Sequence, residues 1–171
     1  MEVQEAIRTV LSVRKYTDQP VPEDVIRQVL EAGRLTASGG NDQRWTFIVV
    51  QDRAKLEELA AASPSGPYTA HAAFAIVVVT DDNAFGTSDA SRAIQNMTLA
   101  GWSLGLGSVW VGFPKMLTQI NPLLGIPEDK VVAAILPFGY PADPSLGKGV
   151  KKRKPFDEVV HWGGWGGKAT S

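Results

Sequence analysis

The spacing of apolar residues in the first third of the chain predicts two helices and then a strand. Apolar side chains recur three and four positions apart over residues 3–11, which is typical of a short amphipathic helix. Residues 22–35 begin with proline and two acidic residues, a favourable helix start, and keep the same periodicity. Polar residues 36–44 then predict a loop, and the bulky, branched run 45–50 predicts a strand.

The pattern continues as an alternation of helices and strands. Small residues cover one face of a long helix that we expect to start at a Thr87 or Ser88 cap and to end near Leu104. Small side chains let another helix approach closely, so this face is expected in the core or in a subunit contact. The other predicted elements are a helix at 53–61, a turn at 64–67, strands at 74–79, 108–111 and 131–138, and a helix at 113–123.

The end of the chain, residues 139–171, is rich in glycine, proline and lysine and has little helical pattern. We expect it to form an extended arm that lies on something else, such as a neighbouring subunit. Val159, Val160 and Trp162 favour a short strand within it. For the final WGGWGG motif, disorder is the simplest interpretation, with a peptide-binding segment or a cover over the active site as alternatives.

Length, composition and charge limit the class of protein. The 171 residues, 44% of them hydrophobic and 20% charged, suit a single domain spanning residues 1–171. A formal charge of −1 gives no general attraction to nucleic acid or to an anionic membrane. The sequence contains no cysteine, and its two histidines have no carboxylate at a ligand spacing, so no metal site is expected. It shows neither an export signal nor a membrane span, which favours the cytoplasm.

Four stretches together resemble the nitroreductase family in order and spacing along nearly the whole chain. They are SVRKY at 12–16, TASGGNDQRW at 36–45, LGLGSVWVG at 104–112, and GYPAD at 139–143 followed by KKRKP at 151–155. The resemblance implies an α+β fold with a central, mostly antiparallel sheet flanked by helices. It also implies an interlocked homodimer, with the C-terminal arm reaching the partner and two FMN sites at the interface.

The activity implied by the resemblance is hydride transfer in two alternating steps. NADH or NADPH gives hydride to the flavin N5 and leaves, and a small electron-poor acceptor, such as a nitroaromatic or a quinone, then takes its place. Protein groups position and tune the cofactor, so no acid, base or nucleophile has to stand out in the sequence. Family variants that consume their own FMN or dehalogenate a substrate fit the same pattern.

Two basic stretches are candidates for the FMN phosphate. Taken singly, SVRKY and KKRKP are most simply a solvated turn and a solvated charge run. In the family they converge on the phosphate, which assigns Ser12, Arg14, Lys151 and Arg153 to it, because a doubly charged phosphate needs several fixed donors. This chain departs from the family at Val10, where an arginine is usual, so that either FMN binding is weaker or Lys152 or Lys154 offsets the missing donor.

The loop at residues 36–45 is the next candidate, and by resemblance it passes along the flavin of the other subunit. Ser38, Gly39 and Asn41 occupy the matching positions. Glycine allows close approach to a flat ligand, and an asparagine amide can pair with the ring edge. The alternative is an ordinary helix-ending loop. Arg44 replaces the proline that is common in the family, so the rigidity of the loop is an open question.

The third candidate is the turn and strand at 104–112. By resemblance, a backbone amide near Val111 or Gly112 points at the flavin N5, and Gly105 and Gly107 contact the cofactor. Alternatively, these two glycines only make the turn from helix to strand, and Trp110 only fills the core. A basic residue beside the flavin N1 has no candidate between Lys55 and Arg92.

Two other functions remain as alternatives. A flavin carrier that does not turn over would use the same binding residues. A serine hydrolase would use Ser103 of the GWSLG motif, with His161 and either Asp143 or Asp157. The hydrolase is disfavoured, because Ser103 lies inside a continuous helical pattern rather than at a strand–turn–helix elbow.

Overall fold

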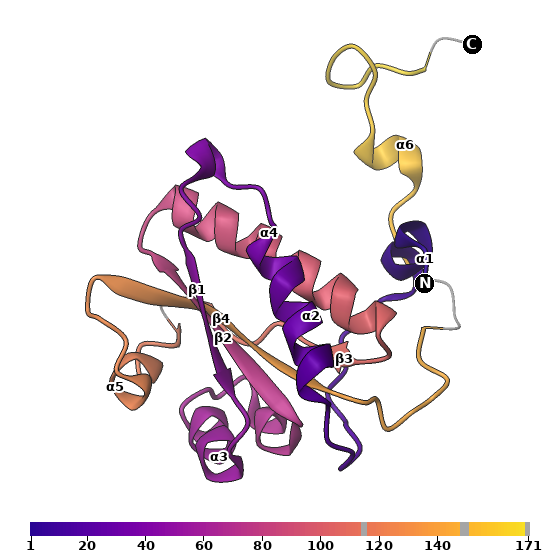
Figure 1. The fold of residues 1–171 in the computed structure, drawn as a ribbon. Coiled ribbons are helices and arrows are strands. Elements are labelled where there is room, and N and C mark those ends of the chain that lie inside the picture. Colours follow the sequence, from indigo (N-terminus) through magenta and orange to yellow (C-terminus); the bar gives the residue numbers. More distant parts are fainter. Residues whose placement is uncertain (114–115, 148–150, 170–171) are drawn as a thin grey trace.

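An antiparallel sheet of four strands forms the centre of the computed structural model, which describes residues 1–113, 116–147 and 151–169 (Figure 1). Its strand order is β1-β2-β4-β3, and each neighbouring pair is antiparallel. This confirms the expected antiparallel sheet flanked by helices. The strands are β1 (Trp45–Val50), β2 (Phe74–Asp81), β3 (Gly107–Ser108) and β4 (Lys130–Gly139).

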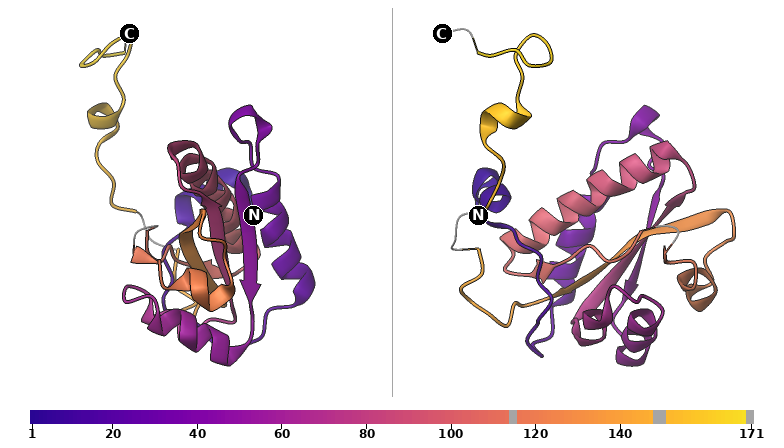
Figure 2. Two further views of the ribbon diagram at one scale, coloured as in Figure 1. Left: turned by 90° about the vertical axis from the view of Figure 1, so that its left-hand side faces the viewer. Right: turned by 180° about the vertical axis from the view of Figure 1, so that it is seen from behind.

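Helices cover both faces of the sheet. One apolar cluster joins α2 and α4 to the sheet, and a second joins α3 and α5 to the opposite face (Figures 1 and 2). The helices are α1 (Val3–Thr9), α2 (Glu23–Arg34), α3 (Arg53–Ala61), α4 (Ala84–Ser103), α5 (Ile120–Leu124) and α6 (Phe156–Val159), with the short 3₁₀ helices η1 (Gly39–Asn41) and η2 (Pro67–His71).

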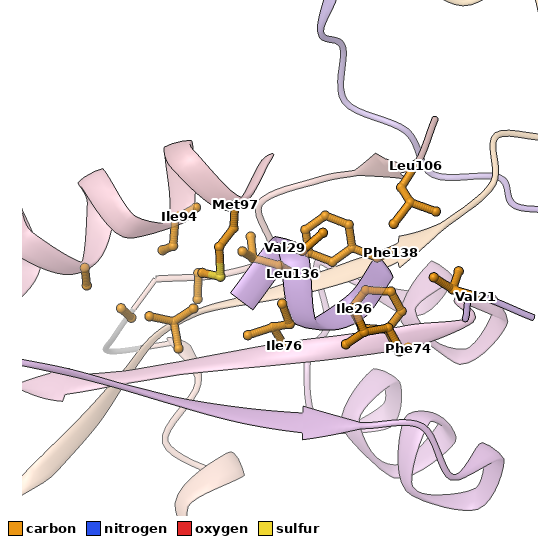
Figure 3. Close-up of a cluster of buried hydrophobic side chains, with 14 residues drawn as sticks. Val21, Ile26, Val29, Phe74, Ile76, Ile94, Met97, Leu106, Leu136 and Phe138 are labelled. Atoms are coloured by element: carbon orange, nitrogen blue, oxygen red, sulfur yellow. The ribbon is translucent and has the colours of Figure 1, made fainter. Parts of the chain in front are cut away.

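The two-residue repeat of the sheet divides the core between its faces. In β2, Phe74, Ile76 and Val78 belong to the cluster under α2 and α4, whereas the alternate residues belong to the other cluster. Figure 3 shows Met97 of α4 and Val29 of α2 gathered over Ile76. The sheet is therefore buried on both sides, which explains why β2 is apolar along nearly its whole length.

The long helix α4 begins one turn earlier than the sequence predicts. Asn83, in an extended conformation, caps it, since its side-chain oxygen accepts a hydrogen bond from the Gly86 amide at 2.8 Å. Thr87 and Ser88 lie inside the first turns, so the prediction that one of them is the cap was wrong. The helix can extend because Gly86 passes so close to β2 that a Cβ there would lie 2.4 Å from the Asp81 carbonyl oxygen.

Three other predicted elements differ from the structure. The strand expected at 108–111 is limited to β3 (Gly107–Ser108), and beyond it Val111 makes an isolated bridge to Ile135. The helix expected at 113–123 is limited to α5 (Ile120–Leu124), and residues 114–115 of that prediction lie outside the described residues. Phe113 and Met116 are exposed, so the apolar spacing there does not mark a buried helical face. Of the residues expected in a short strand, Val159 ends helix α6, Val160 is extended without forming a strand, and Trp162 lies in a bend. The helix begins after Pro155 and has two acidic residues in its first turn, as at residues 22–24.

The described residues after 150 extend away from the sheet and pass beside α1 (Figures 1 and 2). The Lys151 ammonium donates a hydrogen bond to the Ile7 carbonyl at 2.7 Å. Further on, the WGGWGG segment closes into a turn, in which the Trp162 amide donates to the Gly167 carbonyl at 3.0 Å. In residues 1–113, 116–147 and 151–169 we find no helix with the length and apolar character of a membrane span.

Candidate functional site

Residues from the two ends of the chain meet in a hollow of about 280 Å³ beside the middle of α4. We call it the Ser12 hollow. The segment after α1, the inner turns of α4, the residues around β3 and one side chain of the C-terminal arm all contribute to it. Its polar and aromatic lining consists of Ser12, Gln95, Thr98, Ser108, Trp110 and Arg153.

Backbone pairing with β3 fixes Ser12. The amide of Val13 donates to the Ser108 carbonyl at 2.9 Å, and the Val13 side chain is buried. A Cβ at Gly107 would lie 2.5 Å from the Val13 Cβ, so the close approach of the two segments requires glycine there. Ser12 itself is exposed. Gly107 therefore has a structural role, because it lets the segment that carries Ser12 lie against β3.

Two of the three predicted basic residues lie at or near the hollow. Arg153 lines it, and partial burial together with the positive charge of Arg153 lowers the pKa of Lys151. Arg14 does not line it, because its guanidinium carbon lies 5.7 Å from the centre of the Tyr68 ring in η2. In this single chain, Ser12 and Arg153 thus come together with Lys151 nearby, whereas Arg14 faces elsewhere.

Sequence reasoning missed the side chains that α4 and the strand region add to the hollow. Gln95 and Thr98 line the hollow together with Val10 and offer it an amide and a hydroxyl. Trp110 is 37% exposed. The alternative that it only fills the core was therefore wrong. Its indole N–H donates to the Gly112 carbonyl at 2.7 Å, which leaves the ring as a wall of the hollow. The positions of Gln95, Thr98 and Trp110 in the sequence do not by themselves predict that these residues line a site.

Of the two amides considered for the flavin N5, the sheet uses one. The Val111 amide donates to the Ile135 carbonyl at 3.0 Å, and Ile135 returns the bond at 3.1 Å. The Gly112 amide has no hydrogen-bond partner among the described residues, and Gly112 is buried with φ +75°. Gly105, with φ +85°, ends α4 in the left-handed region. Of the two amides, that of Gly112 is the one that the sheet does not use.

The loop that carries Ser38, Gly39 and Asn41 lies at the other end of α4, beside its first turns (Figure 1). The Gly39 amide donates to the Asp89 carboxylate at 3.2 Å. None of the three loop residues lines the Ser12 hollow. Within one chain the two groups of candidate residues are therefore separate.

The hydrolase alternative has no supporting geometry. Ser103 is the last residue of the continuous helix α4, and its hydroxyl donates to the Ala100 carbonyl at 2.8 Å. Neither a histidine nor a carboxylate hydrogen-bonds to Ser103 in the described part of the chain. The same residues contain no group of three or more histidine, aspartate or glutamate side chains placed to hold a metal ion.

Comparisons with known proteins cover most of the chain. The sequence profile of the nitroreductase family matches residues 7–82 and 65–140. A protein of Methanothermobacter thermautotrophicus, provisionally named NADH dehydrogenase/NAD(P)H nitroreductase, is 39% identical over 151 residues, which are 84% of this chain and 79% of that protein. The profile match includes Ser12, the loop and Trp110 but ends before KKRKP.

Solved structures show the same similarity. An FMN-dependent nitroreductase from Clostridium difficile superimposes with a TM-score of 0.84 at 27% identity, over 94% of this chain and 99% of its own. The NADPH:FMN oxidoreductase from Vibrio harveyi, solved in complex with NAD⁺, gives a TM-score of 0.83 at 28% identity, over 95% of this chain and 77% of its own. The fold described above is thus common to these proteins.

Proposed function

Because this chain belongs to the nitroreductase family, we propose that it is an FMN-dependent oxidoreductase that passes hydride from NADH or NADPH to a small electron-poor acceptor. A nitroaromatic compound or a quinone represents the acceptor class. The descriptions of the Clostridium difficile and Vibrio harveyi proteins support FMN and a nicotinamide as the two cofactors. The observation that carries the proposal is the meeting of Ser12 and Arg153 in one hollow.

The residues of the Ser12 hollow fit the phosphate of FMN. A hydroxyl from Ser12, a guanidinium from Arg153 and the nearby ammonium of Lys151 provide donors for a dianion. Burial and, to a smaller degree, the positive charge of Arg153 lower the pKa of Lys151, which places a second cation close to Arg153. These two cations at or near the hollow favour an anionic group such as a phosphate there.

A second subunit is the proposed source of the rest of the site. The hollow of about 280 Å³ is slightly below the size range of pockets that enclose a whole small ligand. Meanwhile the loop at 38–43 presents a polar surface elsewhere on the same chain. We assign the loop to the cofactor of the partner in a homodimer, with the C-terminal arm extending onto that partner.

When bound, FMN supplies the two-electron chemistry by taking up hydride and giving it to the acceptor. Ser12 and Arg153 bind its phosphate and fix its orientation. Trp110, Ile94 and Val109 exclude water along one side of the hollow. Gly112 offers the amide that donates a hydrogen bond to the ring, because the neighbouring Val111 amide is used in the sheet. No side chain has to change protonation state for these roles.

Replacing Arg153 tests the assignment of the phosphate site. Arg153→Ala removes a charged donor, so the dissociation constant for FMN is expected to rise by about tenfold or more. Lys168→Ala is the matched control, because it removes an exposed cation of the same arm that does not line the hollow. Fluorescence titration of the apoprotein with FMN measures both.

Equal FMN affinity in wild type and Arg153→Ala would contradict the role of Arg153. Failure of the wild-type protein to bind FMN at all would contradict the proposed function itself. A loss of affinity in both variants would indicate a general charge effect of the arm rather than a phosphate contact.

A further inference from the structure

The loop at residues 38–43 adopts a backbone shape that its residues do not favour on their own. Gly40, Asn41 and Gln43 all lie in the left-handed region, with φ values of +62°, +59° and +50°. Only one of the three is glycine, so two residues with side chains are in a conformation that is uncommon for them. Such a shape persists only when the surroundings fix it.

Arg44 and Asp89 supply those surroundings. The Asp89 carboxylate accepts a hydrogen bond from the Gly39 amide at 3.2 Å and from the Arg44 guanidinium at 3.0 Å. The same guanidinium also donates to the Gly39 carbonyl at 3.3 Å and pairs with Asp42. One arginine and one carboxylate thus tie the beginning, the middle and the end of the loop together. We call this set of contacts the Arg44 clamp.

The clamp rests on the rigid part of the molecule. Asp89 is 1% exposed and lies on α4, whose next residue, Ala90, belongs to the main apolar cluster. The Arg44 side chain is only 19% exposed, and its guanidinium carbon lies 5.3 Å from the centre of the Phe85 ring. A buried carboxylate needs a partner, and the other cation near it, Arg92, is 3.7 Å away. Of the two cations, Arg44 is the one that hydrogen-bonds to Asp89.

The clamp leaves the ligand-binding groups of the loop available. The Ser38 hydroxyl accepts a bond from the Gln43 amide at 2.9 Å and keeps its own hydrogen to donate. The Asn41 side chain is exposed, and its amide has no hydrogen-bond partner among residues that the structure describes. The contacts thus fix the backbone while two polar side chains stay free to meet a ligand.

We propose that Arg44, acting through Asp89, is a positioning residue that holds Ser38 and Asn41 in the arrangement that meets FMN. This inference rests on the proposed function, since it takes the loop to contact the cofactor of the partner subunit. A loop that is already in its bound shape loses less conformational freedom when the cofactor binds.

Variants of Arg44 test the proposal in the FMN-loaded protein. Arg44→Ala removes every contact of the clamp except the bond from the Gly39 amide to Asp89, and Arg44→Lys keeps the charge but lacks the planar fork of donors that bonds Asp89, Asp42 and the Gly39 carbonyl at once. We expect Arg44→Ala to release FMN about tenfold faster than wild type, with Arg44→Lys between the two. The visible circular dichroism of the bound flavin should also change in Arg44→Ala, because the groups at the ring edge move.

Arg27→Ala is the matched control, since it removes an arginine whose ion pair with Glu23 lies on the exposed surface of α2. It should match wild type in FMN release and in the flavin spectrum. Amide hydrogen exchange of the apoprotein adds a measurement that does not depend on the cofactor. Exchange over residues 39–43 should be faster in Arg44→Lys, while exchange in β2 and β4 stays unchanged.

The outcomes separate this proposal from the proposed function. A wild-type protein that binds no FMN overturns the proposed function. A wild type that binds FMN, with Arg44→Ala equal to it in release rate and flavin spectrum, overturns only the clamp. Should Arg44→Ala fail to fold, Arg44→Lys decides by the same measurements, and unchanged FMN release together with unchanged exchange at 39–43 overturns the clamp.

Discussion

Tyr16 ties the segment that carries Ser12 to the central sheet. Its hydroxyl donates to the Val13 carbonyl at 2.8 Å and lies 3.2 Å from the Pro137 carbonyl of β4. Gly139 passes so close to the ring that a Cβ there would lie 2.9 Å from it. Burial raises the pKa of the Tyr16 hydroxyl well above its ordinary value, with a smaller contribution from Tyr68. The side chain therefore stays a neutral donor in the folded protein.

Because the pKa of Tyr16 is raised, the folded protein should lose stability at alkaline pH. Above the ordinary tyrosine pKa near 10, the unfolded chain loses the proton while folded Tyr16 keeps it, so the free energy of unfolding falls as pH rises, by at most about 1.4 kcal/mol per pH unit. Tyr16→Phe lacks this dependence, and at pH 8 it should be less stable by about 1–2 kcal/mol because the Val13 carbonyl loses its donor. Urea unfolding of both proteins between pH 8 and pH 11 measures it.

The stability difference between wild type and Tyr16→Phe should shrink above pH 10. Other titrating groups are common to both proteins and cancel in the comparison. A difference that stays constant over this range would show that Tyr16 ionises alike in the folded and unfolded states.

The start of α4 gives a prediction at the scale of a single element. Asn83→Ala removes the side chain that caps the helix and should lower the free energy of unfolding by about 1 kcal/mol. Thr87→Ala is the matched control, because Thr87 is exposed inside the helix and alanine favours that position. Its effect should be neutral or slightly stabilising in urea unfolding. The reverse order of stabilities would place the cap where the sequence suggested it.

Elements with a strong local pattern were predictable. A strand buried on both faces has to be apolar along its length, and the sequence shows such runs for β2 and β4. A helix buried on one face has apolar residues three and four positions apart, as α2 does. The start of α4 was not predictable, since Asn83, Thr87 and Ser88 are all suitable caps by residue type. The first turn of α4 packs against the end of β2 at Gly86, and the local spacing of residues does not show such a contact between elements.

The candidate site was predictable to a similar degree. Resemblance to a family placed Ser12 and Arg153 together, and the structure brings both to one hollow. The parts supplied by α4, namely Gln95 and Thr98, look like ordinary polar positions of a helix. The ion pair of Arg44 with Asp89 joins two charged residues from different elements, and the sequence around neither residue predicts it. Pairs of this kind become visible only when the three-dimensional structure is known.

At the scale of the whole molecule, the surface of the C-terminal arm agrees with assembly. Trp165 is 97% exposed, and Phe156, Val159 and Trp162 are each more than half exposed on the same short segment. Apolar side chains gathered in this way commonly mark a surface that another molecule covers. Together with a hollow too small to enclose a cofactor, this supports a homodimer in which each site draws on both chains.

Anaerobic titration of the purified, FMN-loaded protein with NADH and NADPH tests whether the bound flavin transfers hydride. We expect a yellow protein whose flavin absorbance is lost on addition of at least one nicotinamide and returns when a nitroaromatic or a quinone is added. A protein whose bound FMN neither nicotinamide reduces would be a flavin carrier, and one that takes up no FMN would not be a flavoprotein. Either result would rule out the proposed oxidoreductase.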